Sequence, residues 1–186
     1  MKLSSDNTIA LIIDLQERLA PVMNDAPNLI ANARYLLEGL NVCKVPIVLT
    51  RQYPKGLGDT IPEIKTVSES AVVLDKTTFS CLADLKIRNF FVTDSRPNVL
   101  LAGAETHICV LQTALDLLEL GKNVFLVADC VSSRNAFDSE IALKRSIQSG
   151  VIPTTSESVL FEITQASGSP EFKAISKLTV AKSAGR

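Results

Sequence analysis

The sequence predicts a three-layer α/β/α sandwich around a parallel sheet. Six apolar runs are short and continuous, and they are rich in Val, Ile and Leu, which suits strands buried on both faces. Helical stretches separate several of these runs, as expected for βαβ units with right-handed crossovers. The expected strands are 9–14, 45–50, 71–76, 98–103, 123–129 and 150–155.

Three helices are predicted from apolar periodicity, at 27–44, 106–120 and 136–150. The first places its apolar residues on one stripe, which indicates a face that packs on the sheet. The second and third stop at Gly121 and Gly150, which are plausible C-terminal caps. The residues of the apolar stripe are Leu29, Ala33, Leu36, Leu37 and Leu40.

Two stretches are less regular. The segment 51–70 is rich in Gly and Pro and is expected to be a loop with a short helix, and long loops in compact domains are often functional. The tail after Gly168 is expected to form one more short helix.

Composition and length indicate one domain covering residues 1–186. The net charge is −1, so the chain lacks the excess of positive charge that would attract nucleic acid or an anionic membrane. No apolar run approaches the roughly 20 residues that span a bilayer. The polar N-terminus does not resemble a signal peptide, so a cytoplasmic location is expected.

The four cysteines, Cys43, Cys81, Cys109 and Cys130, form no CxxC motif and are expected to be reduced thiols. With a single histidine in the chain, the usual zinc spacing cannot be built, and no metal or other cofactor is expected.

Three chemically active residues follow strands of the predicted sheet. Asp14 ends the first strand, Lys76 ends the third, and Cys109 lies shortly after the fourth. Ligands of open parallel sheets bind beyond the carboxyl ends of the strands, so these side chains should meet at one edge. Each has a structural alternative: Asp14 could bond loop amides, Lys76 could be solvated, and Cys109 could be a buried thiol. Together they supply a proton acceptor, a cation and a nucleophile.

The position of Cys109 on its helix favours reactivity. With Thr106 as N-cap, Cys109 falls in the first turn, where free N–H groups and the helix dipole favour a thiolate. Its helical neighbours Gln112, Thr113 and Asp116 are polar. His107 is two residues away and points about 200° from Cys109, so it is expected to pack or cap and not to act as the base.

The other cysteines have simpler interpretations. Cys43 is expected in the core, and Cys81 is expected to be partly exposed. Cys130 follows a strand end and could line the site without acting in it.

Four segments resemble the isochorismatase-like, or cysteine hydrolase, superfamily. They are "ALIIDLQERL", "LDKTTFSCL", "GVIPTTSESVLFEI" and the long block "LLAGAETHICVLQTALDLLELGKNVFLVADCVSSRN". The resemblance covers residues 9–163 in order and is most specific around the cysteine. It implies a Rossmann-like fold with strand order 3-2-1-4-5-6 and a homo-oligomer, either a dimer or a larger assembly.

The resemblance also implies roles for residues. Asp14 would take the proton of the Cys109 thiol, Lys76 would stabilise the thiolate, and Cys109 would attack a carbonyl to give a thioester that water resolves. A cis peptide at Ala104–Glu105 would aim the backbone N–H groups of Glu105 and Cys109 at the oxyanion.

The sequence departs from two branches of this superfamily. Nicotinamidases carry an aspartate and two histidines after the second strand, whereas "TRQYPKGLGDTIPE" contains no histidine. True isochorismatases lack the nucleophilic cysteine that this chain retains. The resemblance is therefore to the small metal-free members, which have a nucleophilic cysteine.

The leading hypothesis is a cysteine hydrolase that cleaves a C–N bond of a small amide or ureido substrate. Arg51, Tyr53 and Phe79 are expected to line its pocket. The alternative is a non-hydrolytic protein on the same scaffold, whose thiol senses oxidants or binds a ligand. Neither hypothesis involves nucleic acid or a membrane as a partner.

Overall fold

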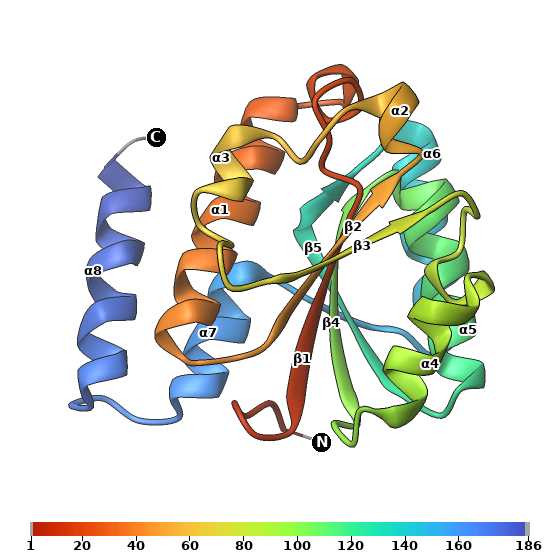
Figure 1. Ribbon diagram of the computed structural model, residues 1–186. Coiled ribbons are helices and arrows are strands. Elements are labelled where there is room, and N and C mark those ends of the chain that lie inside the picture. Colours follow the sequence, from red (N-terminus) through yellow and green to blue (C-terminus); the bar gives the residue numbers. More distant parts are fainter. Residues whose placement is uncertain (1, 185–186) are drawn as a thin grey trace.

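Six parallel strands form one sheet in the order β3-β2-β1-β4-β5-β6, which confirms the predicted topology. The computed structural model describes residues 2–184 (Figure 1). The strands are β1 (Thr8–Ile13), β2 (Ile47–Gln52), β3 (Val72–Lys76), β4 (Asn98–Ala104), β5 (Asn123–Ser132) and β6 (Ile152–Thr154). The order reverses between β1 and β4, so the central strand β1 lies at the switch point where ligands of such sheets bind.

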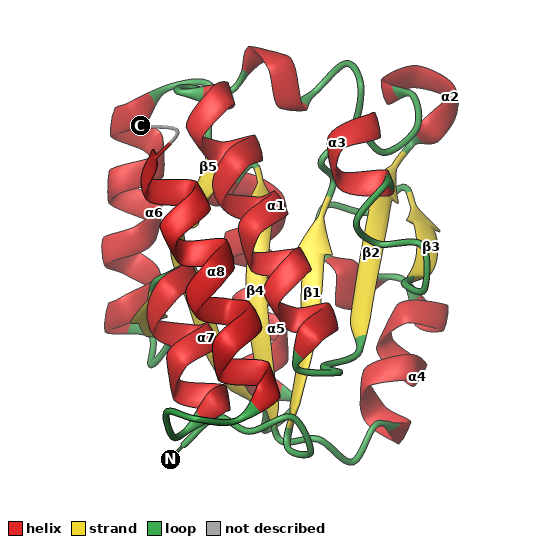
Figure 2. Cartoon of the chain, turned by 90° about the vertical axis from the view of Figure 1, so that its left-hand side faces the viewer, coloured by secondary structure: helices red, strands yellow, loops and turns green. Residues whose placement is uncertain are grey.

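Helices cover both faces of this sheet. In Figures 1 and 2, α1, α7 and α8 lie on one face, while α4, α5 and α6 lie on the other. The α-helices are α1 (Ala26–Val42), α2 (Pro54–Leu57), α3 (Pro62–Lys65), α4 (Leu85–Thr93), α5 (Leu111–Glu119), α6 (Ala136–Gln148), α7 (Ser156–Thr164) and α8 (Pro170–Ala184). Short turns of other helix types are η1 (Ala20–Val22), η2 (Cys81–Ala83) and η3 (Thr106–Val110).

The structure is more helical than the sequence patterns indicated. α4 and α7 were not among the predicted helices, and α8 has 15 residues where a short helix was expected. The segment 51–70 holds the end of β2 and two single-turn helices, both of which begin with a proline. No helix among residues 2–184 is both long and apolar enough to cross a membrane.

Side-chain caps explain where several helices begin. Asp84 accepts hydrogen bonds from the first backbone N–H groups of α4, and Asn135 does the same for α6. Thr155 accepts from the N–H of Ser158 at the start of α7. Each cap satisfies N–H groups that have no partner within the helix.

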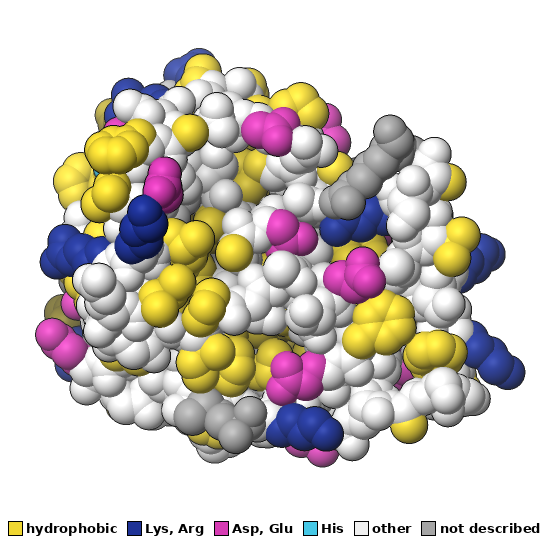
Figure 3. Space-filling model, turned by 180° about the vertical axis from the view of Figure 1, so that it is seen from behind, with side chains coloured by type: hydrophobic (Ala, Val, Ile, Leu, Met, Phe, Trp, Pro, Cys, Tyr) yellow, Lys and Arg dark blue, Asp and Glu magenta, His cyan; other side chains and the backbone are white. Residues whose placement is uncertain are grey.

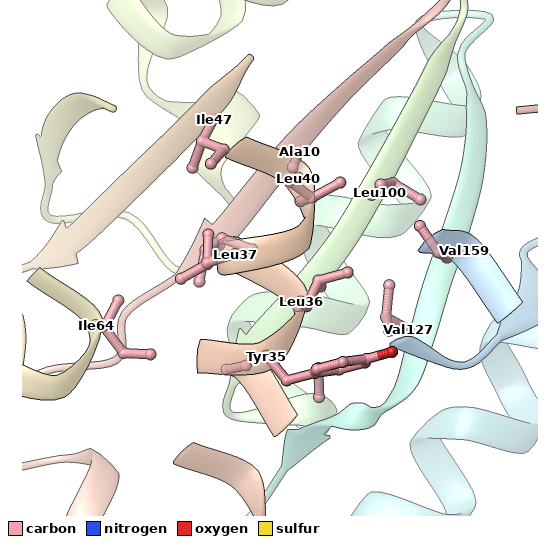
Figure 4. Close-up of a cluster of buried hydrophobic side chains, with 14 of the residues drawn as sticks. Ala10, Tyr35, Leu36, Leu37, Leu40, Ile47, Ile64, Leu100, Val127 and Val159 are labelled. Atoms are coloured by element: carbon pink, nitrogen blue, oxygen red, sulfur yellow. The ribbon is translucent and has the colours of Figure 1, made fainter. Parts of the chain in front are cut away.

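The predicted stripe of α1 is buried against the sheet. Leu36, Leu37 and Leu40 are fully buried, and Figure 4 shows them facing Ala10 of β1 and Leu100 of β4. A second apolar cluster on the opposite face joins β1 and β4 to α4 and α5. Burying both faces of the central strands fixes their positions and hence the positions of the residues that follow them.

Candidate active site

Asp14 and Lys76 form a fully buried ion pair at the carboxyl edge of the sheet. Lys76 Nζ lies 2.7 Å from Asp14 Oδ2, and neither side chain is exposed to solvent. The other carboxylate oxygen, Asp14 Oδ1, accepts a hydrogen bond of 2.7 Å from Thr50 Oγ1. Both oxygens are therefore held in place, as a buried carboxylate requires.

The ammonium group of Lys76 is surrounded by oxygen atoms. Besides Asp14, it donates to Gln52 Oε1 at 2.6 Å and to the carbonyl oxygens of Thr78 and Phe79 at 3.2 Å each. An ammonium group has three protons, so these acceptors satisfy it completely. The lysine thereby fixes the loop that follows β3.

Cys109 is buried on a turn of π-helix. It is the fourth residue of η3 and has 5% of its surface exposed. The prediction that Thr106 caps this helix was wrong, because Glu105 precedes the first helical residue and the Thr106 hydroxyl accepts a hydrogen bond from Ser139 Oγ. Cys109 lies close enough to Asp14 for the carboxylate to act on its thiol.

The structure corrects the expected ionisation of Cys109. Burial and the negative charge of Asp14 raise the pKa of the thiol to about 12, and Lys76 offsets only part of this shift. Lys76 favours the thiolate, as expected, but burial of the sulfur acts in the opposite direction and has the larger effect. Burial therefore opposes loss of the thiol proton, and the side chain of Asp14 is the neighbouring group that could accept it.

The charge of Lys76 is retained despite its burial. Burial disfavours the ammonium form, but the negative charges of Asp14 and of the ionised forms of Cys81 and Cys109 outweigh it, so the pKa of Lys76 is raised. The site therefore combines a lysine whose ammonium form is favoured, the acid Asp14 and two buried thiols.

Cys81 is a buried neighbour of this site, and the expectation that it is partly exposed was wrong. It is 0% exposed, its backbone N–H donates to Thr113 Oγ1 at 3.0 Å, and its sulfur lies 4.0 Å from Thr50 Oγ1. Thr113 is one of two polar residues of α5 that bind the loop after Lys76. The other is Asp116, whose carboxylate accepts a hydrogen bond from the Ser80 hydroxyl. The part of the loop at Ser80 and Cys81 is buried, and α5 binds both residues there.

Burial of Cys81 predicts alkaline destabilisation. Burial raises the pKa of this thiol from 9.0 to about 11, so the folded state binds its proton more tightly than the unfolded state does. The stabilisation contributed by the protonated Cys81 thiol is complete below pH 9 and is lost as the pH rises towards 11. This loss lowers the free energy of unfolding by about 3 kcal/mol. Urea unfolding at pH 8 and pH 11 under reducing conditions measures it. The Cys81→Ala variant should lose less stability over this interval, and an equal loss would contradict the prediction.

The remaining histidine and cysteines lie outside the ion pair. His107 Nδ1 hydrogen-bonds to Ser133 Oγ at 2.9 Å, which agrees with the capping or packing role expected for it. Cys43 is buried at the end of α1, as expected. Cys130 is fully buried beside Asp129, and burial raises its pKa.

The peptide bond between Ala104 and Glu105 is cis. The Glu105 carboxylate accepts hydrogen bonds from the backbone N–H and the side chain of Arg134, at 3.1 and 3.0 Å. Whether the N–H groups of Glu105 and Cys109 bind an oxyanion stays a prediction.

The residues expected to line the pocket have different surroundings. Tyr53 is 55% exposed and lines a hollow of about 340 Å³ beside Lys76. Phe79 is 57% exposed, and its carbonyl binds Lys76. The Arg51 guanidinium is bound by Asp75 and Asp59, which raises its pKa. Their contact with a substrate stays a prediction.

A larger cavity of about 860 Å³ lies beyond β5, and no residue of the ion pair lines it. Its walls come from the start of α1, the end of β5 and α6. In residues 2–184, no three His, Cys, Asp or Glu side chains gather closely enough to hold a metal ion.

Thr50 and Gln52 are the site residues that sequence reasoning missed. Both lie on β2, one strand away from Asp14, and their side chains bind Asp14 and Lys76. Alternate residues of a strand share a face, so the pair could have been found by placing β2 next to β1.

The fold and this cluster define a class of protein: a Rossmann-like α/β domain with a cysteine, an acid and a lysine at the switch point. The isochorismatase domain model matches residues 8–158, and the chain therefore belongs to the isochorismatase family. This confirms the resemblance seen in the sequence.

Individual relatives match most of the chain. Isochorismatase domain-containing protein 2 of Danio rerio is 39% identical over 177 residues, covering 95% of this chain and 89% of the relative. The secreted isochorismatase effector Isc1 of Phytophthora sojae is 38% identical over 182 residues, covering 95% and 86%. The solved structure of MAR1 ribonuclease from Caenorhabditis elegans has a TM-score of 0.90 and 38% identity, covering 97% of this chain and 93% of its own. Because one relative is secreted, the expected cytoplasmic location stays a prediction, as does the homo-oligomer.

Proposed function

We propose that this protein is a hydrolase that cleaves a C–N bond of a small amide or ureido substrate through Cys109. The observation that carries the proposal is the buried thiol of Cys109 beside the side chain of Asp14, which is itself held by the buried lysine Lys76. A nucleophile beside a base that a third group orients is the arrangement used in covalent catalysis.

The proposed reaction begins with proton transfer from Cys109 to Asp14 as sulfur attacks the carbonyl carbon. The new C–S bond moves an electron pair onto the carbonyl oxygen, and the N–H groups of Glu105 and Cys109 would stabilise it. Collapse expels the amine, which takes the proton from Asp14 and leaves a thioester. Asp14 then accepts a proton from water as the water attacks the thioester. As the C–S bond breaks, Asp14 returns this proton to the Cys109 sulfur, which restores the thiol and releases the acid product.

Lys76 has a fixed role in this scheme. Its ammonium group holds Asp14 Oδ2 and carries the positive charge that lowers the pKa of Cys109 against the effect of burial. Because the proton moves from one member of the cluster to another, the total charge of the site does not change during the attack. Such a transfer suits a buried site, where adding a net charge is costly.

The oxidant-sensing alternative is less well supported. Peroxides react with the thiolate, and burial raises the pKa of the Cys109 thiol, which disfavours that form. The positive and negative side chains on the face drawn in Figure 3 are interspersed, and the chain has a net charge of −1. RNA binding depends mainly on basic surface, so an amide substrate fits this chain better than RNA does.

The test is detection of the acyl-enzyme. We expect a panel of small amides and ureas to include a substrate that adds its acyl mass to Cys109 after acid quenching. Cys109→Ala should lose both the adduct and the turnover, whereas the control Cys43→Ala should keep both, because Cys43 lies at the far end of α1. Turnover retained by Cys109→Ala would overturn the proposal. Adduct formation with peroxide, without turnover of any amide or urea in the panel, would favour the sensing alternative.

A further inference from the structure

Gln52 makes the shortest hydrogen bond to the Lys76 ammonium group. The two residues are paired in register at the ends of β2 and β3, and Gln52 Oε1 lies 2.6 Å from Lys76 Nζ. The amide end is also fixed, since Gln52 Nε2 donates to the carbonyl of Thr77 at 2.8 Å. The side chain therefore has a single orientation, with its oxygen towards the lysine.

The backbone of Gln52 is held as firmly as its side chain. Gln16, which is fully buried, accepts from the Gln52 N–H at 2.7 Å and donates to the Gln52 carbonyl at 3.1 Å. The same Gln16 amide donates to Gly58, which ties the loop after β2 to this point. Several hydrogen bonds therefore fix where the amide oxygen meets the lysine.

The charge of the oxygen that meets Lys76 matters for the thiol. The charged or titratable groups that act on Lys76 and Cys109 are Asp14, Cys81 and one another. Of the four oxygens around the ammonium, only that of Asp14 carries a charge. A carboxylate in place of the Gln52 amide would put a second negative charge beside the Lys76 ammonium group. It would thereby raise the pKa of the Cys109 thiol and oppose formation of the thiolate.

We propose that Gln52 is a positioning residue of the active site, which holds the Lys76 ammonium group with an uncharged oxygen so that its positive charge remains available to the Cys109 thiol. This inference deepens the proposed function and rests on it. Gln52 acts through Lys76 and touches neither the thiol nor a reacting atom.

Two variants separate charge from hydrogen bonding. Gln52→Glu keeps an acceptor oxygen and adds a negative charge, whereas Gln52→Met is similar in length, uncharged and lacks the acceptor. Both lose the bond to the Thr77 carbonyl, so they are matched for that loss. Gln148→Glu, on the exposed end of α6, controls for a negative charge added far from the site.

The measurement is the rate at which iodoacetamide labels Cys109 between pH 7 and pH 11, followed on the Cys109 peptide by mass spectrometry. We expect Gln52→Glu to be labelled at least about tenfold more slowly than Gln52→Met, equivalent to one pK unit. The labelling profile of Gln52→Glu should shift to higher pH than that of Gln52→Met. The profile of Gln148→Glu should match that of the unmodified protein. Urea unfolding midpoints identify any variant that fails to fold.

Equal labelling profiles for Gln52→Glu and Gln52→Met would overturn the inference, because they would show that Gln52 only supports the loop at Thr77. Labelling needs no turnover, so this result is independent of the hydrolase proposal. Retention of turnover by Cys109→Ala would instead remove the proposed function itself.

Discussion

Replacing Gly103 by alanine is expected to lower the free energy of unfolding by more than about 3 kcal/mol, or to prevent folding. Gly103 lies on β4 beside Ile13 and has a φ of +117°, a conformation that residues with a side chain rarely adopt. An added Cβ would lie 2.0 Å from the carbonyl oxygen of Ile13 and 2.6 Å from its nitrogen. These are backbone atoms of a central strand, so they cannot rotate away.

The matched control is Gly121→Ala. Gly121 also has a positive φ, +81°, but an added Cβ would meet no atom within 4 Å. Only the left-handed backbone conformation should cost stability there, about 1–2 kcal/mol. Urea unfolding of both variants separates the close contact from the backbone strain. Similar losses for the two variants would contradict the claim that the approach of β4 to β1 requires glycine at position 103.

Gly103 links the fold to the active site. Ile13 immediately precedes Asp14, which has a φ of 53°, and Gly103 lies six residues before Cys109. The close approach of these two strands therefore sets the separation between base and nucleophile. For this reason Gly103→Ala should also reduce Cys109 labelling in any fraction that folds.

Two of the strand ends were predictable because an apolar run ends there in a charged residue. Lys76 ends β3, Asp14 follows β1, and Cys109 lies in the turn after β4, as the sequence patterns indicated. The rule that parallel strands present their carboxyl ends together was enough to bring these three residues to one edge.

Other features depend on three-dimensional contacts that no sequence pattern records. The sequence places Cys109 near a helix end but does not show how deeply the thiol is buried, and burial has the largest effect on its pKa. Cys81 was expected to be partly exposed because it lies in the segment after Lys76, yet it is fully buried and its backbone N–H donates to Thr113 of α5. α4 was missed because its buried face consists of only Ile87 and Phe91.

Lys76→Met is expected to lower the free energy of unfolding by about 3–5 kcal/mol, because it leaves the Asp14 carboxylate buried without its cation. Neither side chain of this pair is exposed, so water cannot replace the lysine. Four oxygen atoms would also lose their donor at the same time. The variant should react with iodoacetamide more slowly at Cys109, since Lys76 lowers the pKa of this thiol.

A double-variant cycle separates loss of the ion pair from loss of packing. Asp14→Asn combined with Lys76→Met leaves no unpaired charge, and it should be more stable than Lys76→Met alone. The exposed pair Arg34–Glu38, with 48% and 29% of the side chains exposed, provides the control, since Arg34→Met should cost at most about 1 kcal/mol. Urea unfolding of the unmodified protein, Asp14→Asn, Lys76→Met and the double variant measures the cycle, and Arg34→Met is measured beside them. A loss in Lys76→Met no larger than that in Arg34→Met would show that the Asp14 charge is stabilised by other groups. That result would contradict the role proposed for Lys76 in holding the Asp14 carboxylate.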